Sequence, residues 1–153
     1  IKTSPQNDNL SDTKLQQLEF WNKYKDYVRN IDSTIRLQTP RPLHWYDVTM
    51  GSSDAHIGLT INSRDNAISC EIYIPRNKDL YHFMINSKDE IEKKIGDKIE
   101  WIAAPIASRI KIRKDVHDLF DQTGWNEQFK WLYEKTIVFK QVFGKYLSEY
   151  KKV

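Results

Sequence analysis

The chain has 153 residues and a formal net charge of +3, from 24 basic and 21 acidic side chains. This length is typical of one domain. The near balance of charge excludes a strongly basic or acidic chain, so an anionic partner would have to be recognised by a local cluster of cations. Aromatic residues make up 12% of the sequence, which favours a packed core over low-complexity disorder.

The single cysteine, Cys70, excludes an internal disulfide and favours a reducing compartment. No apolar run is long enough to span a bilayer, and no signal-peptide pattern is recognised. We therefore expect a cytoplasmic protein that does not contact a membrane. Residues 1–10 are interpreted as an inter-domain linker or the remnant of a trimmed tag, and residues 11–153 as a single domain.

Three segments carry apolar residues at helical spacing. The first, about residues 12–30, follows Ser11, a residue type that caps helix N-termini, and precedes the helix-breaking sequence TPRP. The second covers residues 77–96 and ends at a glycine; a capping-box pattern at residues 87–90 could divide it into two helices. The third is a long amphipathic helix over residues 125–150.

Five segments alternate apolar and polar residues with the period of two that is typical of half-buried strands. They are residues 43–50, 56–62, 67–75, 98–105 and 107–115. Short turns between the first three predict an antiparallel meander. The order α-βββ-α-ββ-α predicts an α+β fold: a mainly antiparallel five-stranded sheet with helices packed on one face and the other face exposed to water.

Several segments together are similar to one known family. They are LEFWNKYKDYV, RPLHWYDVTMGSSDAHIGLTIN, EIYIP, IEKKIGDKIEWI, RIKI and FKWLYEKTIVFKQVF. On these segments, over about residues 15–147, the chain resembles the bacterial and archaeal domain-of-unknown-function family DUF4268. The resemblance implies a C-terminal module of a larger protein whose N-terminal domain is often nuclease-like, of the PD-(D/E)XK kind. It implies no catalytic residues, because the family has no established activity.

The most suggestive segment is SRIKIRK, residues 108–114. On a strand, Ile110 and Ile112 would face one side, and Arg109, Lys111 and Arg113 the other. Successive cations would then stand about 7 Å apart. Phosphates along one nucleic acid strand lie roughly 6–7 Å apart, so such a row can follow a phosphate backbone.

We therefore predict a nucleic-acid site on this strand, with an exposed tyrosine of a neighbouring strand as a stacking group. The site comprises Arg109, Lys111, Arg113, Lys114 and Tyr73. The alternative is a solvated sheet face or an edge strand protected by charge. In that case Glu71 and Glu100 would pair with the cations across strands.

Other patterns in the sequence are incomplete as functional motifs. Asp47 and Glu71 lie on predicted strands, as nuclease carboxylates would, but position 73 is a tyrosine where the PD-(D/E)XK pattern needs a lysine. The four histidines are scattered and form no metal-binding pattern with Cys70; they are His44, His56, His82 and His117. Residues 50–56 lack a phosphate-loop spacing and are interpreted as a hairpin turn. No metal or cofactor is expected.

The last helix raises the question of a second chain. Trp131, Val138 and Val142 fall outside its main apolar stripe. A helix that is apolar around much of its circumference is either deeply packed or in contact with another chain or domain.

From the sequence we expect a non-catalytic accessory domain of a bacterial DNA-processing or defence protein. It would bind DNA or RNA, or dock a nuclease-like domain of the same chain, through the basic sheet face. The alternatives are a protein–protein interaction module that forms a homodimer and a diverged metal-dependent nuclease that uses Asp47 and Glu71. The missing lysine favours a domain without catalysis of its own, and the question of an enzyme stays open.

Overall fold

The structure, a computed structural model, describes residues 11–151. Its centre is a five-stranded sheet in the order β1-β2-β3-β5-β4, in which every neighbouring pair is antiparallel. The strands are β1 (Trp45–Thr49), β2 (His56–Asn62), β3 (Ala67–Ile74), β4 (Glu100–Ala103) and β5 (Ser108–Asp115). β1, β2 and β3 form the predicted meander, and β5 lies between β3 and β4.

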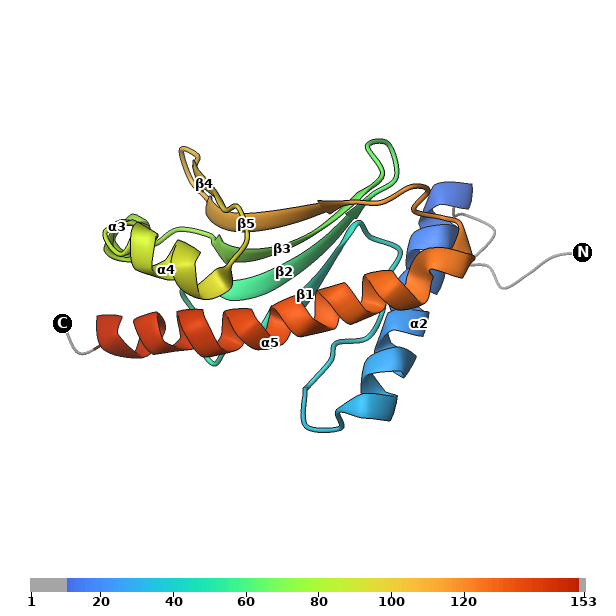
Figure 1. Cartoon of the computed structure of the whole chain (residues 1–153), viewed down its shortest axis with the longest axis horizontal. Coiled ribbons are helices and arrows are strands. Elements are labelled where there is room, and N and C mark those ends of the chain that lie inside the picture. Colours follow the sequence, from blue (N-terminus) through green and yellow to red (C-terminus); the bar gives the residue numbers. More distant parts are fainter. Residues whose placement is uncertain (1–10, 152–153) are drawn as a thin grey trace, which may run out of the picture.

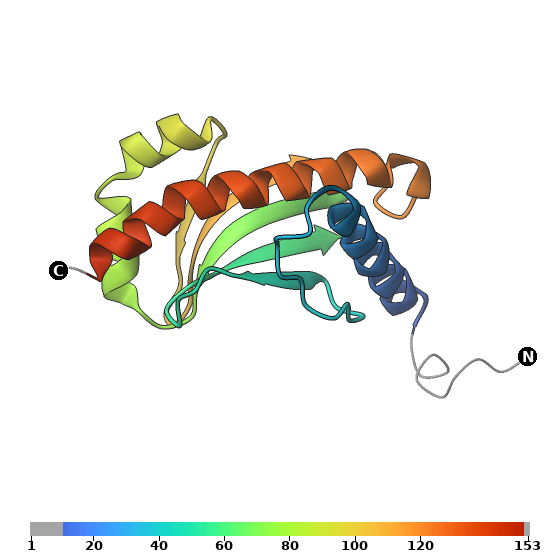
Figure 2. The same ribbon diagram turned by 90° about the horizontal axis from the view of Figure 1, so that it is seen from below.

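Four α-helices pack against this sheet. They are α2 (Asp12–Ile31), α3 (Lys78–Ile85), α4 (Lys88–Ile95) and α5 (Trp125–Tyr150), with the short 3-10 helix η1 (Gln122–Gly124) before α5. α5 runs along one face of the sheet, α2 crosses that face near the start of α5, and α3 and α4 lie at the opposite end (Figures 1 and 2). The predicted α+β fold is confirmed, and within residues 11–151 no helix covers the other face.

The helix predicted over residues 77–96 is two helices, so the order is α-βββ-αα-ββ-α. Gly96 ends the second of them in the left-handed conformation, with φ of +79°, as predicted. The predicted capping box is wrong, because the side chain of Ser87 makes no capping bond. Glu90 instead accepts a hydrogen bond from the hydroxyl of Tyr146 on α5. A contact between helices has replaced the local contact that the sequence pattern indicates.

Four strands are shorter than the sequence predicts, β3 and β5 by one residue each and the other two by more. β1 covers residues 45–49 of the predicted 43–50, and β4 covers 100–103 of the predicted 98–105. The first helix begins as predicted, with the Ser11 hydroxyl accepting a hydrogen bond from the backbone N–H of Lys14. The linker predicted for residues 1–10 lies outside the described residues. Within residues 11–151, no helix is both long enough and apolar enough to cross a membrane.

An aromatic cluster joins α2 to the sheet and to α5. Phe20 lies edge-on to Trp125 and Phe129, with ring centroids 5.1 and 5.0 Å away. Trp21 stacks on Tyr46 of β1, with centroids 5.1 Å apart. All five side chains are buried, and edge-to-face pairs of this kind add to the free energy of burial. The cluster therefore holds the first strand and the two long helices together.

Two hydrogen bonds from this cluster anchor the irregular segment between α2 and β1. The indole Nε1 of Trp21 donates to the carbonyl of Leu43 at 2.8 Å. The hydroxyl of Tyr46 donates to the carbonyl of Gln38 at 2.6 Å. Buried indole and phenol groups need such partners, and here the partners fix the chain that leads into β1.

The off-stripe residues of α5 are accounted for by packing. Trp131, Val138 and Val142 are partly buried and pack against the core. Cys70 is fully buried on the same side of β3 as the isoleucines. These contacts explain the wide apolar surface of the helix, and the homodimer stays a prediction.

We expect Trp21→Phe to lower the free energy of unfolding by about 1–3 kcal/mol, because the partly buried carbonyl of Leu43 loses its donor. Urea denaturation followed by circular dichroism measures the change. Trp45→Phe is the matched control, since that indole is 40% exposed, and its effect should stay within about 0.5 kcal/mol. Equal stability of both variants would contradict the anchoring role of Trp21.

Candidate functional site

The helix-free face of the sheet, called the open face below, is defined by the strand registers. Side chains alternate between the two faces of a sheet, and residues paired across strands share a face. A short cross-strand row of Asn62, Ala67 and Asp115 lies next to the β2–β3 turn, and three longer rows cross the rest of the open face. In order from β1 the longer rows are Thr49, His56, Tyr73, Arg109 and Ile102; Asp47, Gly58, Glu71, Lys111 and Glu100; and Trp45, Thr60, Ser69 and Arg113.

A groove of about 1000 Å³ lies over this face. Strands β1, β2, β3 and β5 provide its floor, and Thr13 and Gln17 of α2 line it as well. In Figure 1 the β2–β3 hairpin and the β4–β5 hairpin rise from opposite ends of the open face, which is the upper face in that view. The groove is therefore a concave surface between two raised hairpins.

Three of the four predicted cations lie in this groove. Arg109, Lys111 and Arg113 alternate along β5 with the buried Ile110 and Ile112, and all three line the groove. The extended conformation predicted for this segment is confirmed. Arg109, Lys111 and Arg113 are called the cation column below.

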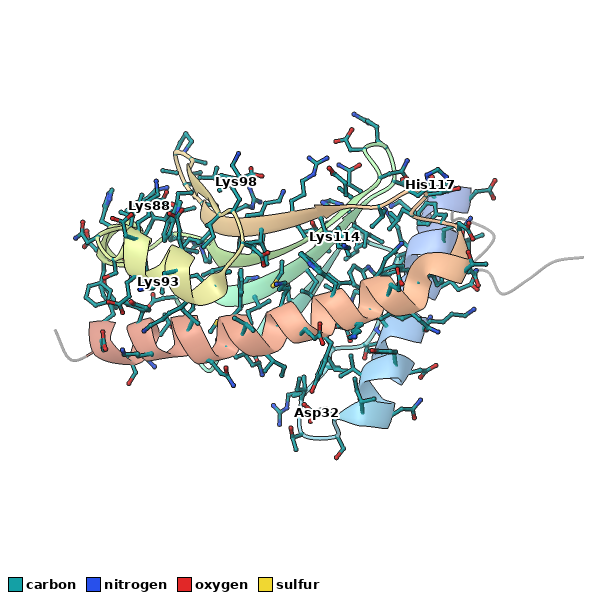
Figure 3. All side chains as sticks on the ribbon, viewed as in Figure 1. Asp32, Lys88, Lys93, Lys98, Lys114 and His117 are labelled. Atoms are coloured by element: carbon teal, nitrogen blue, oxygen red, sulfur yellow. The ribbon has the colours of Figure 1, made fainter. Side chains whose placement is uncertain are left out.

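Lys114 is on the other side of β5. It pairs in register with Ile68, a buried core residue, and therefore has the opposite orientation to Arg113. Figure 3 labels Lys114 near the end of this strand. The structure thus does not bring Lys114 to the open face, where the sequence prediction had grouped it with the cation column.

The centre of the groove contains a buried carboxylate. The side chain of Glu71 is only 7% exposed, and its Oε2 accepts a hydrogen bond from Nε of Arg109 at 3.0 Å. Burial raises the pKa of Glu71, and the nearby charges of Arg109, Lys111 and His56 oppose that rise. The pairing with Arg109 that the sequence left open as an alternative is therefore present.

Gly58 makes room for this carboxylate. A Cβ at position 58 would lie 3.3 Å from Cγ and 3.5 Å from Oε2 of Glu71. A contact of 3.3 Å between two carbon atoms is closer than their optimal separation of about 3.5–4.0 Å. The glycine thus lets the side chain of Glu71 lie over β2 rather than stand away from the sheet.

Tyr73 lies between two groups from neighbouring strands. The guanidinium carbon of Arg109 is 5.0 Å from the centre of its ring, within the range of a cation–π contact. The His56 ring lies on the other neighbouring strand, with centroids 5.2 Å apart, and Nε2 of His56 is 3.4 Å from Oδ1 of Asp47. Arg109 therefore contacts both Tyr73 and Glu71, and its guanidinium covers part of the predicted stacking surface.

The other two cations of the column, Arg113 and Lys111, are more available to a ligand than Arg109 is. Nη2 of Arg113 is 3.1 Å from Oδ1 of Asp115, whose side chain is 81% exposed. Such an exposed pair contributes about 0–1 kcal/mol and exchanges readily with other anions. Lys111 stands in register between Glu71 and Glu100. Within residues 11–151, no carboxylate lies within 4.0 Å of its ammonium group.

The predicted nuclease carboxylates share one row but are not adjacent. Asp47 on β1 and Glu71 on β3 are separated by Gly58 of β2. Lys111, on β5, stands beside Glu71 in the same row, so a lysine is present although position 73 is a tyrosine. Among the described residues, no group of three or more histidine, cysteine or acidic side chains is arranged to hold a metal.

Sequence reasoning missed several contributors to the groove, among them a tryptophan and a histidine. Trp45 and His56 line it from the two strands farthest from the cation column. Alternation along β1 and β2 could have placed both on the open face, but the pairing of β5 with β3 could not be read from local spacing. The turn between β1 and β2 is a hairpin loop as predicted, with Gly51 at a φ of +71°.

These features define a small α+β domain with one face of its sheet packed under helices and a concave, polar open face. The family described as Domain of unknown function (DUF4268) matches residues 16–147, so the chain belongs to this family. The resemblance noted from the sequence is confirmed. Neither the curated proteins nor the solved structures include a match.

The buried carboxylate predicts a specific dependence of stability on pH. Because burial raises the pKa of Glu71 above its usual 4.5, the folded protein holds this proton to higher pH than the unfolded chain does. The wild-type protein should therefore lose unfolding free energy relative to Glu71→Gln as the pH rises from about 4 through the raised pKa. Urea denaturation of both variants between pH ~4 and ~6 measures the difference. A difference that does not change with pH would contradict the assignment.

A double-mutant cycle tests the contact between Gly58 and Glu71. Alanine is normally better than glycine in a strand by roughly 0.5–1 kcal/mol, but here its Cβ meets the Glu71 side chain. Gly58→Ala should therefore be less favourable in the wild type than in the Glu71→Ala background, with a coupling of about 0.5–3 kcal/mol in unfolding free energy. Additive effects would mean that Gly58 is not needed for the position of Glu71.

Proposed function

We propose that this domain binds nucleic acid through its open face, with the phosphate backbone following β5. The observation that carries the proposal is the cation column inside the groove: Arg109, Lys111 and Arg113 on alternate positions of one strand. Two residues of strand span about 7 Å, which suits successive phosphates. Each phosphate that meets a cation releases condensed counterions, and this release favours binding.

The ion pairs in the groove are compatible with this role. Arg109 binds Glu71 through Nε, and a guanidinium has two further nitrogens that can donate to a phosphate. Arg113 binds the exposed Asp115, and a phosphate can replace that carboxylate at little cost. Among residues 11–151, Lys111 has no carboxylate within 4.0 Å of its ammonium group. We assign Lys111 and Arg113 to phosphate contacts, and Arg109 to a shared structural and binding role.

Binding of this kind should depend little on base sequence. Phosphate contacts position a nucleic acid without reading it. We propose a non-catalytic accessory role beside a nuclease-like domain in a DNA-processing or defence protein, as the family resemblance implies. The state of Glu71 supports the non-catalytic part, because its carboxylate is buried and engaged by Arg109 rather than open to a metal ion.

A double variant that spares Glu71 tests the proposal. Lys111→Gln/Arg113→Gln should weaken binding of a labelled oligonucleotide about tenfold or more and reduce the slope of log K against log [salt] by about 1.5. Fluorescence anisotropy over a range of salt concentrations measures both. Lys93→Gln/Lys114→Gln is the matched control, because it removes the same charge from α4 and from the opposite side of β5 (Figure 3).

The two variants separate local from general electrostatics. If the control variant loses as much affinity as the groove variant, net charge rather than the open face is responsible, and the proposal fails. If wild-type protein binds no oligonucleotide at low salt, the proposal also fails, and docking of a neighbouring domain becomes the better account of the groove.

A further inference from the structure

One row of the open face joins an exposed aromatic side chain to the cation column. Trp45 pairs with Thr60, Thr60 with Ser69, and Ser69 with Arg113. All four residues line the groove, and Trp45 is 40% exposed although it is a large apolar side chain. Three strand spacings of about 4.8 Å separate the two ends of the row by roughly 14 Å. This span can take one nucleotide, with its base on Trp45 at one end and its phosphate at Arg113 at the other.

The two hydroxyls between these ends give the row a polar floor. Thr60 Oγ1 and Ser69 Oγ are hydrogen-bonded to each other. A hydroxyl has one donor and two acceptor positions, so the partly exposed Thr60 can also bond a sugar or a base. The row thus offers an aromatic face, a hydroxyl and a cation in the order in which a nucleotide presents base, sugar and phosphate.

On the strands that form the groove floor, the arginine and lysine side chains lie on β5 and the carboxylates on β1 and β3, apart from Asp115 at the end of β5. The cation column is on β5, while Asp47 on β1 and Glu71 on β3 bring carboxylates to the rest of the floor. Carboxylates repel phosphates, so a phosphate backbone is favoured along β5 and disfavoured over β1 and β3. A bound strand would therefore lie in one orientation across the sheet, with its bases directed from β5 toward β1.

We infer that the ligand of this groove is single-stranded nucleic acid, with phosphates along β5 and an unpaired base stacked on Trp45. This inference rests on the proposed function and specifies its ligand. In a duplex the bases are stacked on one another and paired, so no base face is open to an indole in the groove floor. A duplex is also stiff over this length, whereas a single strand can follow a concave floor between the two raised hairpins (Figure 1).

Three probes of equal length separate the contributions of base and backbone. They are an oligothymidine strand, an abasic strand with the same number of phosphates, and a duplex; about 20 nucleotides exceeds the usual site size of single-strand binding folds. Wild-type protein should bind the thymidine strand about 10- to 100-fold more tightly than the abasic strand, because stacking is lost in the latter. It should also bind the thymidine strand more tightly than the duplex.

The variants Trp45→Ala and Trp45→Phe test the stacking contact directly. Trp45→Ala should bind the thymidine strand about 10- to 100-fold more weakly than wild type and leave abasic binding unchanged. Trp45→Phe should restore most of the lost affinity, because it keeps an aromatic face. Wild-type tryptophan fluorescence should be quenched by the thymidine strand, and this quenching should be largely lost in Trp45→Phe.

The outcomes distinguish this inference from the proposed function. Equal affinity of wild-type protein for thymidine and abasic strands, or unchanged thymidine binding by Trp45→Ala, would overturn the inference. So would duplex binding at least as tight as single-strand binding. The proposed function would survive these results if Lys111→Gln/Arg113→Gln still weakened binding. If wild-type protein bound none of the three probes at low salt, both would fall.

Discussion

The open face depends on the register between β3 and β5. In the observed register Tyr73 meets Arg109, and Glu71 meets Lys111. A shift of one residue would reverse every side chain of β5. Ile110 and Ile112 would then face water, and the cation column would face the helices. Both isoleucines are almost completely buried, so the apolar side of the strand holds the polar side in place.

The local features of this face could be predicted from the sequence, and its assembly could not. Alternation along β5 is a local pattern, which is why the orientation of Arg109, Lys111 and Arg113 could be predicted. The insertion of β5 between β3 and β4 depends on contacts far apart in the chain. That insertion brings Arg109 to Glu71 and aligns Trp45 with Arg113. The same alternation excludes Lys114 from the cation column, although Lys114 is adjacent to Arg113 in the chain.

The three cations of the column are not equivalent. Arg109 neutralises a carboxylate that is nearly inaccessible to water, and removing one partner of such a pair leaves an uncompensated charge. In the described part of the chain, Arg113 and Lys111 form no ion pair with a buried carboxylate. Arg113 pairs with the exposed Asp115, and Lys111 is available to a ligand. Replacing Arg109 would therefore change both stability and binding, and a binding assay alone could not separate the two effects. Glu71 and Gly58 act indirectly on the groove, because they determine where the guanidinium of Arg109 lies.

Under the proposed function, a column of three cations would also limit how tightly the domain binds nucleic acid. The electrostatic part of binding grows with the number of phosphates neutralised, and here that number is small and partly offset by Glu71 and Asp47. A domain of this kind is suited to transient contacts rather than to stable capture on its own. Joined to a second nucleic-acid-binding domain, it would act at a high effective concentration and multiply the overall affinity without any new contact. Under the proposed function, modest affinity of the isolated domain would therefore be compatible with an accessory role beside a second binding domain.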